Sequence, residues 1–298
     1  MLDNILPTNT VFVLGASDPE MERISAWLHH AQAIVVMAGN RAKRWVNPSE
    51  AYNTSTLIGT IPRSIRVCNH VLIECDGPAC GKLPGRRVVV DHHKPGHPGY
   101  SLEPRDYWRA SSLGQLARLF GYGLDPVPYP KFYRIGSGPS PWPLPPFAAN
   151  VAACVAAADH CLRAAYAGQC PGVSPEALFE FRVAEKARYR KVSTLEIERQ
   201  IHEASVALSG APEIELAPGV TVKDMRDTPL PDLPEASALM QIGFLGRSTI
   251  AGKTKYTCMG DQGQVSAFLQ VWAPAHGLVD IYGDPVRGYA GAFDDATA

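Results

Sequence analysis

Four short apolar runs, rich in β-branched residues, constrain the fold of this chain more than any other feature. The runs are TVFVL (10–14), AIVVM (33–37), HVLIE (70–74) and RVVV (87–90). Each is apolar at consecutive positions rather than at alternate ones, which is typical of central strands in a parallel sheet covered on both faces. A helical pattern at 17–31 supplies the first crossover. The first half of the chain is therefore predicted to be α/β, a parallel sheet with helical covering.

The second half predicts a change of architecture. Helical patterns recur up to residue 208, interrupted by an excursion rich in proline and glycine at 124–147. After Gly210, short strands alternate with proline-rich turns. We therefore expect three parts: an N-terminal domain at 1–192 that includes the excursion, a linker helix at 193–210, and a smaller α/β domain at 211–298.

Composition narrows the class of function. The chain has 28 Lys and Arg against 29 Asp and Glu, a net charge of -1, which argues against a broad basic surface for long nucleic acid. Its seven cysteines form no Cys-x-x-Cys pair, so we interpret them as reduced thiols. No apolar run reaches the length of a membrane span, and the N-terminus lacks a secretory signal. We predict a cytoplasmic protein with no membrane partner.

Acids and histidines follow three of the apolar runs. Asp18 and Glu20 come after the first run, Asp76 after the third, and Asp91, His92 and His93 directly after the fourth. In an open parallel sheet, ligands bind beyond the carboxyl ends of the strands. Two carboxylates about 4 Å apart repel by on the order of 4 kcal/mol at an effective dielectric near 20, so such a cluster needs cations. Mixed carboxylate and imidazole ligands favour Mn²⁺, with Mg²⁺ or Co²⁺ as competitors.

The stretch VVVDHHKPGH (88–97) resembles the Asp-His-His signature of the DHH phosphoesterases. Further segments are similar to that family in their order along the chain: LGASDPE (14–20), VLIECDGP (71–78), RASSLGQL (109–116), AAADHCL (156–162) and YGDPVRGYAGA (282–292). The last resembles the glycine-rich phosphate motif of the family's associated C-terminal domain. Leu14 departs from the family, because a histidine stands at that place in the family's motif.

The resemblance implies hydrolysis of phosphodiester bonds in short oligonucleotides or dinucleotides, by water activated between two metal ions. The implied metal ligands are Asp18, Glu20, Asp76, His92 and Asp159, with Asp76 bridging the ions. The implied catalytic group is Asp76, Asp91, His92 and His93, in which Asp91 orients an imidazole. The implied substrate contacts are His93, Ser111, Ser112, Arg287 and Gly288. Leu14 and the longer Glu20 predict a looser first metal site.

Four of these acids also have an alternative role. Asp18 and Glu20 suit the first turn of a helix, where acids cap free N–H groups. Asp76 precedes Gly-Pro and suits a turn, and Asp159 could pair with Arg163 one helical turn later.

Two alternative functions stay open at the level of sequence. One is a nucleotide- or oligonucleotide-binding module with weak catalysis. The other is a pyrophosphatase or polyphosphatase, for which Lys94, Arg247 and Arg287 are the candidate cationic groups. A homodimer is compatible with either function.

Overall fold

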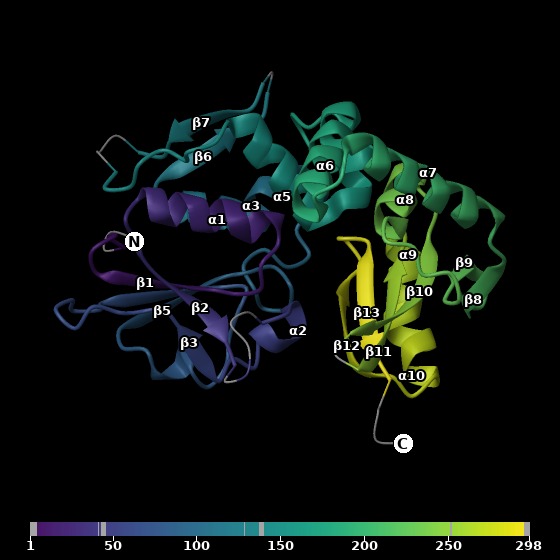
Figure 1. Cartoon of the computed structure of the whole chain (residues 1–298), viewed down its shortest axis with the longest axis horizontal. Coiled ribbons are helices and arrows are strands. Elements are labelled where there is room, and N and C mark those ends of the chain that lie inside the picture. The colour runs from purple at the N-terminus through teal and green to yellow at the C-terminus, as the bar shows by residue number, and fades with distance from the viewer. Residues whose placement is uncertain are drawn as a thin grey trace. The chain divides into compact units, whose positions relative to one another are not determined.

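The computed structural model describes residues 5–40, 42, 46–127, 129–136, 140–250 and 252–294. The chain divides into two compact units. Unit 1 contains Met1–Tyr100 and Asp106–Asp159, and unit 2 contains Ser101–Arg105 and His160–Ala298. Each unit combines a sheet with helices (Figure 1), and the sheet of unit 1 is mainly parallel. The predicted mixed α/β class is confirmed.

Unit 1 is built on a five-stranded sheet in the order β3-β2-β1-β4-β5. The strands are β1 (Thr10–Leu14), β2 (Ile34–Gly39), β3 (Thr56–Ile58), β4 (Asn69–Ile73) and β5 (Arg86–Val90). The pairs β1–β2, β1–β4 and β4–β5 are parallel, so the four apolar runs are the four parallel strands. The edge strand β3 pairs antiparallel with β2 and was not predicted.

Both faces of β1 are buried, as a central parallel strand requires. Val11 and Val13 contribute to one apolar cluster, whereas the Phe12 ring meets the rings of Phe120 and Trp142 edge-on at 5.8 and 5.4 Å.

The helices and helical turns of unit 1 are α1 (Pro19–His30), α2 (Pro48–Ala51), η1 (Cys80–Lys82), α3 (Tyr107–Ala110), α4 (Ser112–Leu119) and the first part of α5 (Ala149–Tyr166). The turn η2 (Pro104–Asp106) spans a division between the units.

The proline-rich excursion covers the core of unit 1. It forms the antiparallel hairpin β6 (Tyr122–Asp125) and β7 (Lys131–Arg134), and residues 128 and 137–139 lie outside the described residues. Beyond the hairpin, the buried Trp142 ring stacks on Phe120 with 3.6 Å between centroids. Trp142 also donates its indole N–H to the backbone oxygen of Ile5. The excursion therefore closes the sheet face that carries Phe12.

Unit 2 contains a six-stranded mixed sheet in the order β12-β13-β11-β10-β9-β8. The strands are β8 (Glu213–Ala217), β9 (Val220–Met225), β10 (Phe244–Ile250), β11 (Lys253–Met259), β12 (Val279–Asp284) and β13 (Tyr289–Phe293). Only β9 and β10 pair in parallel. The helices are α6 (Pro175–Arg190), α7 (Thr194–Gly210), α8 (Leu233–Met240), α9 (Gln262–Ala267), the π-helical turn η3 (Phe268–Trp272) and α10 (Ala273–Ala275).

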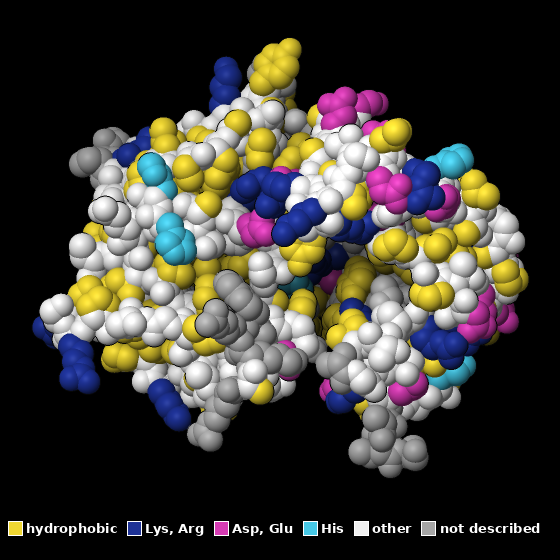
Figure 2. All heavy atoms as spheres, in the orientation of Figure 1, with side chains coloured by type: hydrophobic (Ala, Val, Ile, Leu, Met, Phe, Trp, Pro, Cys, Tyr) yellow, Lys and Arg dark blue, Asp and Glu magenta, His cyan; other side chains and the backbone are white. Residues whose placement is uncertain are grey.

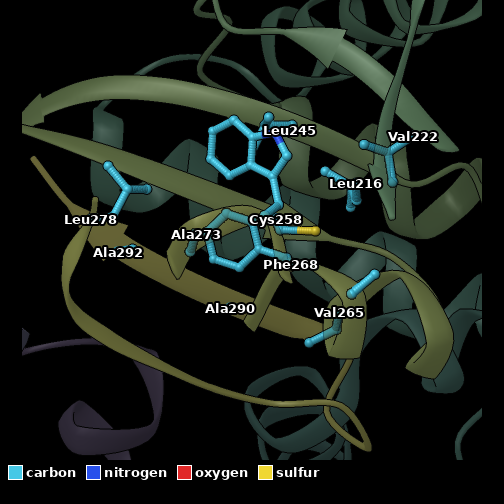
Figure 3. Close-up of a cluster of buried hydrophobic side chains, with 12 residues drawn as sticks. Leu216, Val222, Leu245, Cys258, Val265, Phe268, Ala273, Leu278, Ala290 and Ala292 are labelled. Atoms are coloured by element: carbon cyan, nitrogen blue, oxygen red, sulfur yellow. The ribbon is translucent and has the colours of Figure 1, made fainter. Parts of the chain in front are cut away.

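One face of this sheet packs on the segment from α9 to α10. Leu245, Cys258 and Ala290 project from three neighbouring strands towards Phe268 (Figure 3). Trp272 belongs to the same cluster. All five side chains are buried, so this cluster is the apolar core beneath one face of the sheet.

The helices α6 and α7 belong to unit 2, whereas the sequence placed the end of the first domain at residue 192 and assigned 193–210 to a linker. Buried ion pairs explain the difference. Arg182 contacts Glu235 at 2.7 Å, and both Lys186 and Arg190 contact Asp232 at 2.6 Å, so α6 is joined to α8. On the face drawn in Figure 2, acidic and basic side chains also mingle over α6 and α7.

Candidate metal centre

Four side chains from distant parts of unit 1 meet beyond the carboxyl ends of its parallel strands. Glu20 lies in the first turn of α1, Glu74 follows β4, His92 follows β5, and Asp159 lies in α5. One ligand atom from each residue lies within 4.8 Å of the other three. This is the edge of an open α/β sheet at which ligands bind.

The centre of the group is the buried imidazole of His92. Its Nε2 lies 2.9 Å from Asp159 Oδ2 and 3.6 Å from Glu74 Oε1. Asp159 is the most exposed member, with 22% of its side chain accessible, while Glu20 and Glu74 are buried. Glu74 and His92 also form a second possible ligand group with His93.

The backbone at Glu74 is in the left-handed region, with φ of 51°. This conformation is uncommon for residues other than glycine, and strain of this kind concentrates at functional sites. Gly15 makes it possible for the two strand ends to approach, because a Cβ at Gly15 would lie 2.3 Å from the Glu74 backbone oxygen. Gly15 N–H donates to the Ile73 oxygen, and Glu74 N–H donates to the Val90 oxygen. The three strand ends are thus joined at the site.

Burial and mutual repulsion disfavour negative charge on the two glutamates. Burial, and after it the charge of Asp159, raises the pKa of Glu20 well above its ordinary value. Burial, followed by the charges of Asp18 and Asp159, does the same to the pKa of Glu74. The backbone N–H groups of Ser112 and Leu113 donate to the Glu20 carboxylate at 3.3 and 3.0 Å and offset part of this cost. A bound cation would offset the remaining cost of negative charge on the two glutamates.

Asp91 fixes the histidines rather than joining the ligand group. Its Oδ1 accepts the backbone N–H groups of His92 and His93 at 2.7 and 3.0 Å, and lies 2.9 Å from His93 Nδ1 and 3.1 Å from His97 Nδ1. Tyr52 donates its hydroxyl to Oδ2 at 2.8 Å. Although burial raises the pKa of Asp91, the hydrogen bonds from His93 and His97 lower it below its usual range. Asp91 is therefore a charged anchor for the Asp-His-His loop.

Asp76 lies outside the group that the structure brings together. Its carboxylate contacts Arg87 at 2.8 Å and accepts the Gly77 backbone N–H at 2.7 Å. The acid at the end of β4 that reaches His92 is Glu74, two residues earlier. Sequence reasoning missed Glu74, although it is the last residue of the apolar run HVLIE and therefore lies closer to the strand end.

Asp18 has the alternative role that its position also predicted. It is the N-cap of α1, and its Oδ1 accepts the Met21 backbone N–H at 2.7 Å. Its charge nevertheless contributes to the raised pKa of Glu74. Asp18 therefore lies near the ligand group and stabilises the helix that carries Glu20.

Ser111 and Ser112 support Glu20 and are both buried. Ser111 caps α4 by accepting the Gly114 backbone N–H, and the backbone of Ser112 donates to Glu20. Their role in the structure is to hold the start of α4 against the Glu20 carboxylate.

Arg287 and Gly288 lie in unit 2, where they line a cavity of about 300 Å³ together with Arg163 and Gln241. The Nε of Arg287 donates to the His160 backbone oxygen at 3.0 Å. The other two cations named for a pyrophosphate pocket also have partners. Lys94 lies over the Tyr52 ring at 3.7 Å, and Arg247 contacts Asp227 at 2.7 Å.

The ligand group suits a hard or borderline divalent cation. It offers three carboxylates and one imidazole and contains no thiolate. Among the described residues, the buried Glu74 Oε1 accepts no hydrogen bond, which is costly for an acid oxygen unless a proton or a metal ion binds it. Buried Glu, His and Asp side chains here could therefore hold a metal ion.

No protein-family model, no curated protein and no solved structure matches this chain. The resemblance to the DHH phosphoesterases therefore stays a prediction. Within the described ranges, no helix is both long enough and apolar enough to cross a membrane.

Proposed function

We propose that this protein is a divalent-metal-dependent phosphoesterase of the DHH type, acting on phosphodiester bonds of short oligonucleotides or dinucleotides. The observation that carries the proposal is the convergence of Glu20, Glu74, His92 and Asp159 within 4.8 Å. These residues occupy the carboxyl edge of a parallel sheet, and one of them belongs to the Asp-His-His stretch. Independent capping or turn roles would not bring four such side chains to one point.

The proposed cofactor is Mn²⁺, with Mg²⁺ or Co²⁺ as alternatives, and two ions are proposed. Such ions supply a water of lowered pKa and stabilise negative charge that develops on a phosphoryl group. The four-residue group would hold one ion. Glu74 belongs to both possible ligand groups and would also contribute to a second ion, so it takes the shared position that the sequence assigned to Asp76. With Leu14 buried and apolar at the place of the family's histidine, the first metal site of the resemblance is expected to bind its ion more weakly.

His93 is the proposed phosphate contact. A third of its side chain is exposed, unlike that of His92, which is fully buried. Because Asp91 lies 2.9 Å from His93 Nδ1, that nitrogen donates to the carboxylate, and Nε2 would donate to a phosphate oxygen when both ring nitrogens carry protons. Asp91 thereby positions His93 in one orientation, which is the effect of a carboxylate behind a functional imidazole.

The test is hydrolysis by the purified full chain in the presence of Mn²⁺. The substrates are bis(p-nitrophenyl) phosphate and RNA and DNA of two to five nucleotides, with cyclic dinucleotides and pyrophosphate for comparison. We expect turnover of the diesters that EDTA and His92→Ala both abolish. Oligonucleotide binding without turnover would instead identify a binding module, and turnover of pyrophosphate that excess oligonucleotide does not inhibit would identify a pyrophosphatase.

A further inference from the structure

Two buried cysteines of unit 2 touch each other through their sulfur atoms. The Sγ atoms of Cys161 and Cys170 lie 3.4 Å apart, and one thiol donates a hydrogen bond to the other. Only 1% of Cys161 and 2% of Cys170 is exposed. Both residues are thiols, and no disulfide joins them. At this distance no other atom can stand between the two sulfurs.

The end of helix α5 brings these two cysteines together. Gly168 has a left-handed backbone, with φ of 72°. The N–H groups of Gly168 and Gln169 donate to carbonyl oxygens in the last turn of α5, both at 3.0 Å. This arrangement is the Schellman motif, which ends a helix and turns the chain away from the helix axis. Cys170 follows the motif directly and therefore lies beside Cys161, in the body of the same helix.

Helix α5 is not regular at Cys161. The backbone there has φ of -154° and ψ of 61°, which interrupts the helix. The S–S bond of a disulfide is about 2.05 Å long, so the two sulfurs must approach each other by about 1.4 Å to form one. Because Cys161 lies at the interruption, this movement does not have to distort a regular helical turn.

Single buried thiols of this chain provide a contrast. Burial raises the pKa of the Cys154 thiol to about 11 and that of the Cys258 thiol to about 12. Structural thiols of this kind react slowly with oxidants. In a touching pair, a sulfur that has been oxidised is captured at once by its neighbour, because the second thiol is held at a very high effective concentration. The pair at the end of α5 is therefore the better candidate for redox chemistry.

We propose that Cys161 and Cys170 are a reversible redox site, which hydrogen peroxide oxidises to an intramolecular disulfide. One sulfur attacks the peroxide, the O–O bond breaks, and a sulfenic acid and a water molecule that takes the thiol proton are formed. The other sulfur then attacks the sulfenic sulfur, so that the S–S bond forms, the S–O bond breaks and a second water leaves. The two cysteines together lose two electrons and two protons, which reduce one hydrogen peroxide to two water molecules.

This redox site lies entirely within unit 2 and does not depend on the proposed phosphoesterase activity. Burial favours a small oxidant, and hydrogen peroxide is hardly larger than water. A dithiol reductant reverses the reaction by thiol–disulfide exchange. The site is therefore expected to respond to the redox state of the surroundings, whichever substrate the metal centre takes.

The first experiment treats the full chain with hydrogen peroxide and maps disulfides by mass spectrometry of unreduced peptides. The protein carries Cys68→Ser, because Cys68 is exposed and would otherwise join two molecules. We expect the loss of two thiols, a pair of peptides joined through Cys161 and Cys170 that is lighter than the reduced peptides by two hydrogen atoms, and recovery of both thiols in dithiothreitol.

Two results of this experiment would overturn the proposal. One is a map without the bridge between Cys161 and Cys170, whether every thiol stays reduced or Cys161 is oxidised to a sulfinic acid. The other is a bridge between Cys75 and Cys80 of unit 1 in its place, because these two thiols also hydrogen-bond to each other.

The second experiment measures Tm before and after peroxide treatment. The bridge closes a loop of ten residues and so removes entropy from the unfolded chain. Peroxide should raise Tm by roughly 5 °C in the Cys68→Ser parent and in Cys154→Ser, a change of a buried cysteine in the same helix, and not in Cys170→Ala. Cys161→Ala is the second variant should Cys170→Ala fail to fold. An equal rise in either alanine variant, or no rise in the parent, would contradict the proposal.

Discussion

His92 Nε2 lies 2.9 Å from Asp159 Oδ2, although His92 follows a strand of the sheet and Asp159 lies in a distant helix. The same imidazole nitrogen lies 3.6 Å from Glu74 Oε1. An imidazole and two acids that point at one place can share protons, or they can share a cation, which satisfies all three at once.

Mn²⁺ should stabilise the folded chain through Glu74 and not through Asp76. At a free Mn²⁺ concentration about 100 times the dissociation constant, binding stabilises by about 2.7 kcal/mol, which raises Tm by roughly 5 °C for a chain of this length. Glu74→Gln should abolish most of this shift because it removes a buried ligand. Asp76→Asn should retain it, because Asp76 contacts Arg87 instead. Differential scanning fluorimetry with and without EDTA measures both, and a larger loss in Asp76→Asn would restore Asp76 as the ligand.

Without metal, the protein should lose stability as pH rises above the ordinary glutamate pKa of 4.5. The raised pKa of Glu74 means that the folded state keeps a proton that the unfolded chain releases, so stability falls with pH over this range. Glu74→Gln stays neutral throughout. In EDTA, urea denaturation should therefore show that the free energy of unfolding of the variant increases relative to that of the wild type as pH rises towards neutrality. In saturating Mn²⁺, the wild type should be the more stable of the two. A constant difference across pH would contradict the repulsion inferred at this site.

Gly15→Ala should damage the metal centre without changing any ligand. The added methyl group would lie 2.3 Å from the Glu74 backbone oxygen, so the end of β4 must move. We expect a loss of about 1–3 kcal/mol in the free energy of unfolding, as for overpacked sites, together with weaker Mn²⁺ binding. Gly210→Ala is the matched control, because its Cβ would meet no atom within 4 Å. Calorimetric titration with Mn²⁺ measures the affinity of both variants. Equal affinities of Gly15→Ala and Gly210→Ala would show that the strand ends tolerate displacement.

Glu235→Gln should destabilise unit 2 at neutral pH and much less in acid. Burial raises the pKa of Glu235, but the charges of Arg182 and Lys186 lower it to about 2. A lowered carboxyl pKa adds stability above the ordinary value of 4.5, which is lost as pH falls towards 2. The shift corresponds to about 3 kcal/mol. Denaturation of the wild type and the variant at pH 7 and near pH 2 measures the loss of unfolding free energy caused by the substitution. An equal loss at both pH values would contradict this prediction.

The matched control for that prediction is Glu196→Gln. Glu196 contacts Arg199 at 2.6 Å on the exposed surface of α7, where solvent screens the pair. Its denaturation midpoint should not move at either pH. A loss comparable to that of Glu235→Gln would mean that burial does not decide the strength of these pairs.

The amino-acid sequence alone was enough to predict the parallel strands and the edge of the sheet at which acids gather. The runs at 10–14, 33–37, 70–74 and 87–90 predicted β1, β2, β4 and β5 to within two residues at each end. This worked because burial on both faces of a strand leaves a local pattern, and because parallel strands bring their carboxyl ends to one edge. Of the expected metal ligands, Glu20, His92 and Asp159 meet in the ligand group.

Which acid after β4 reaches His92 depends on how the chain folds in three dimensions. Glu74 and Asp76 are two residues apart and both carry a carboxylate, so the sequence alone does not show which of them reaches His92. Glu74 reaches His92 because its backbone is left-handed and because Gly15 lets the strand ends approach each other. Asp76 contacts Arg87 instead. Each of these contacts depends on residues brought together by folding.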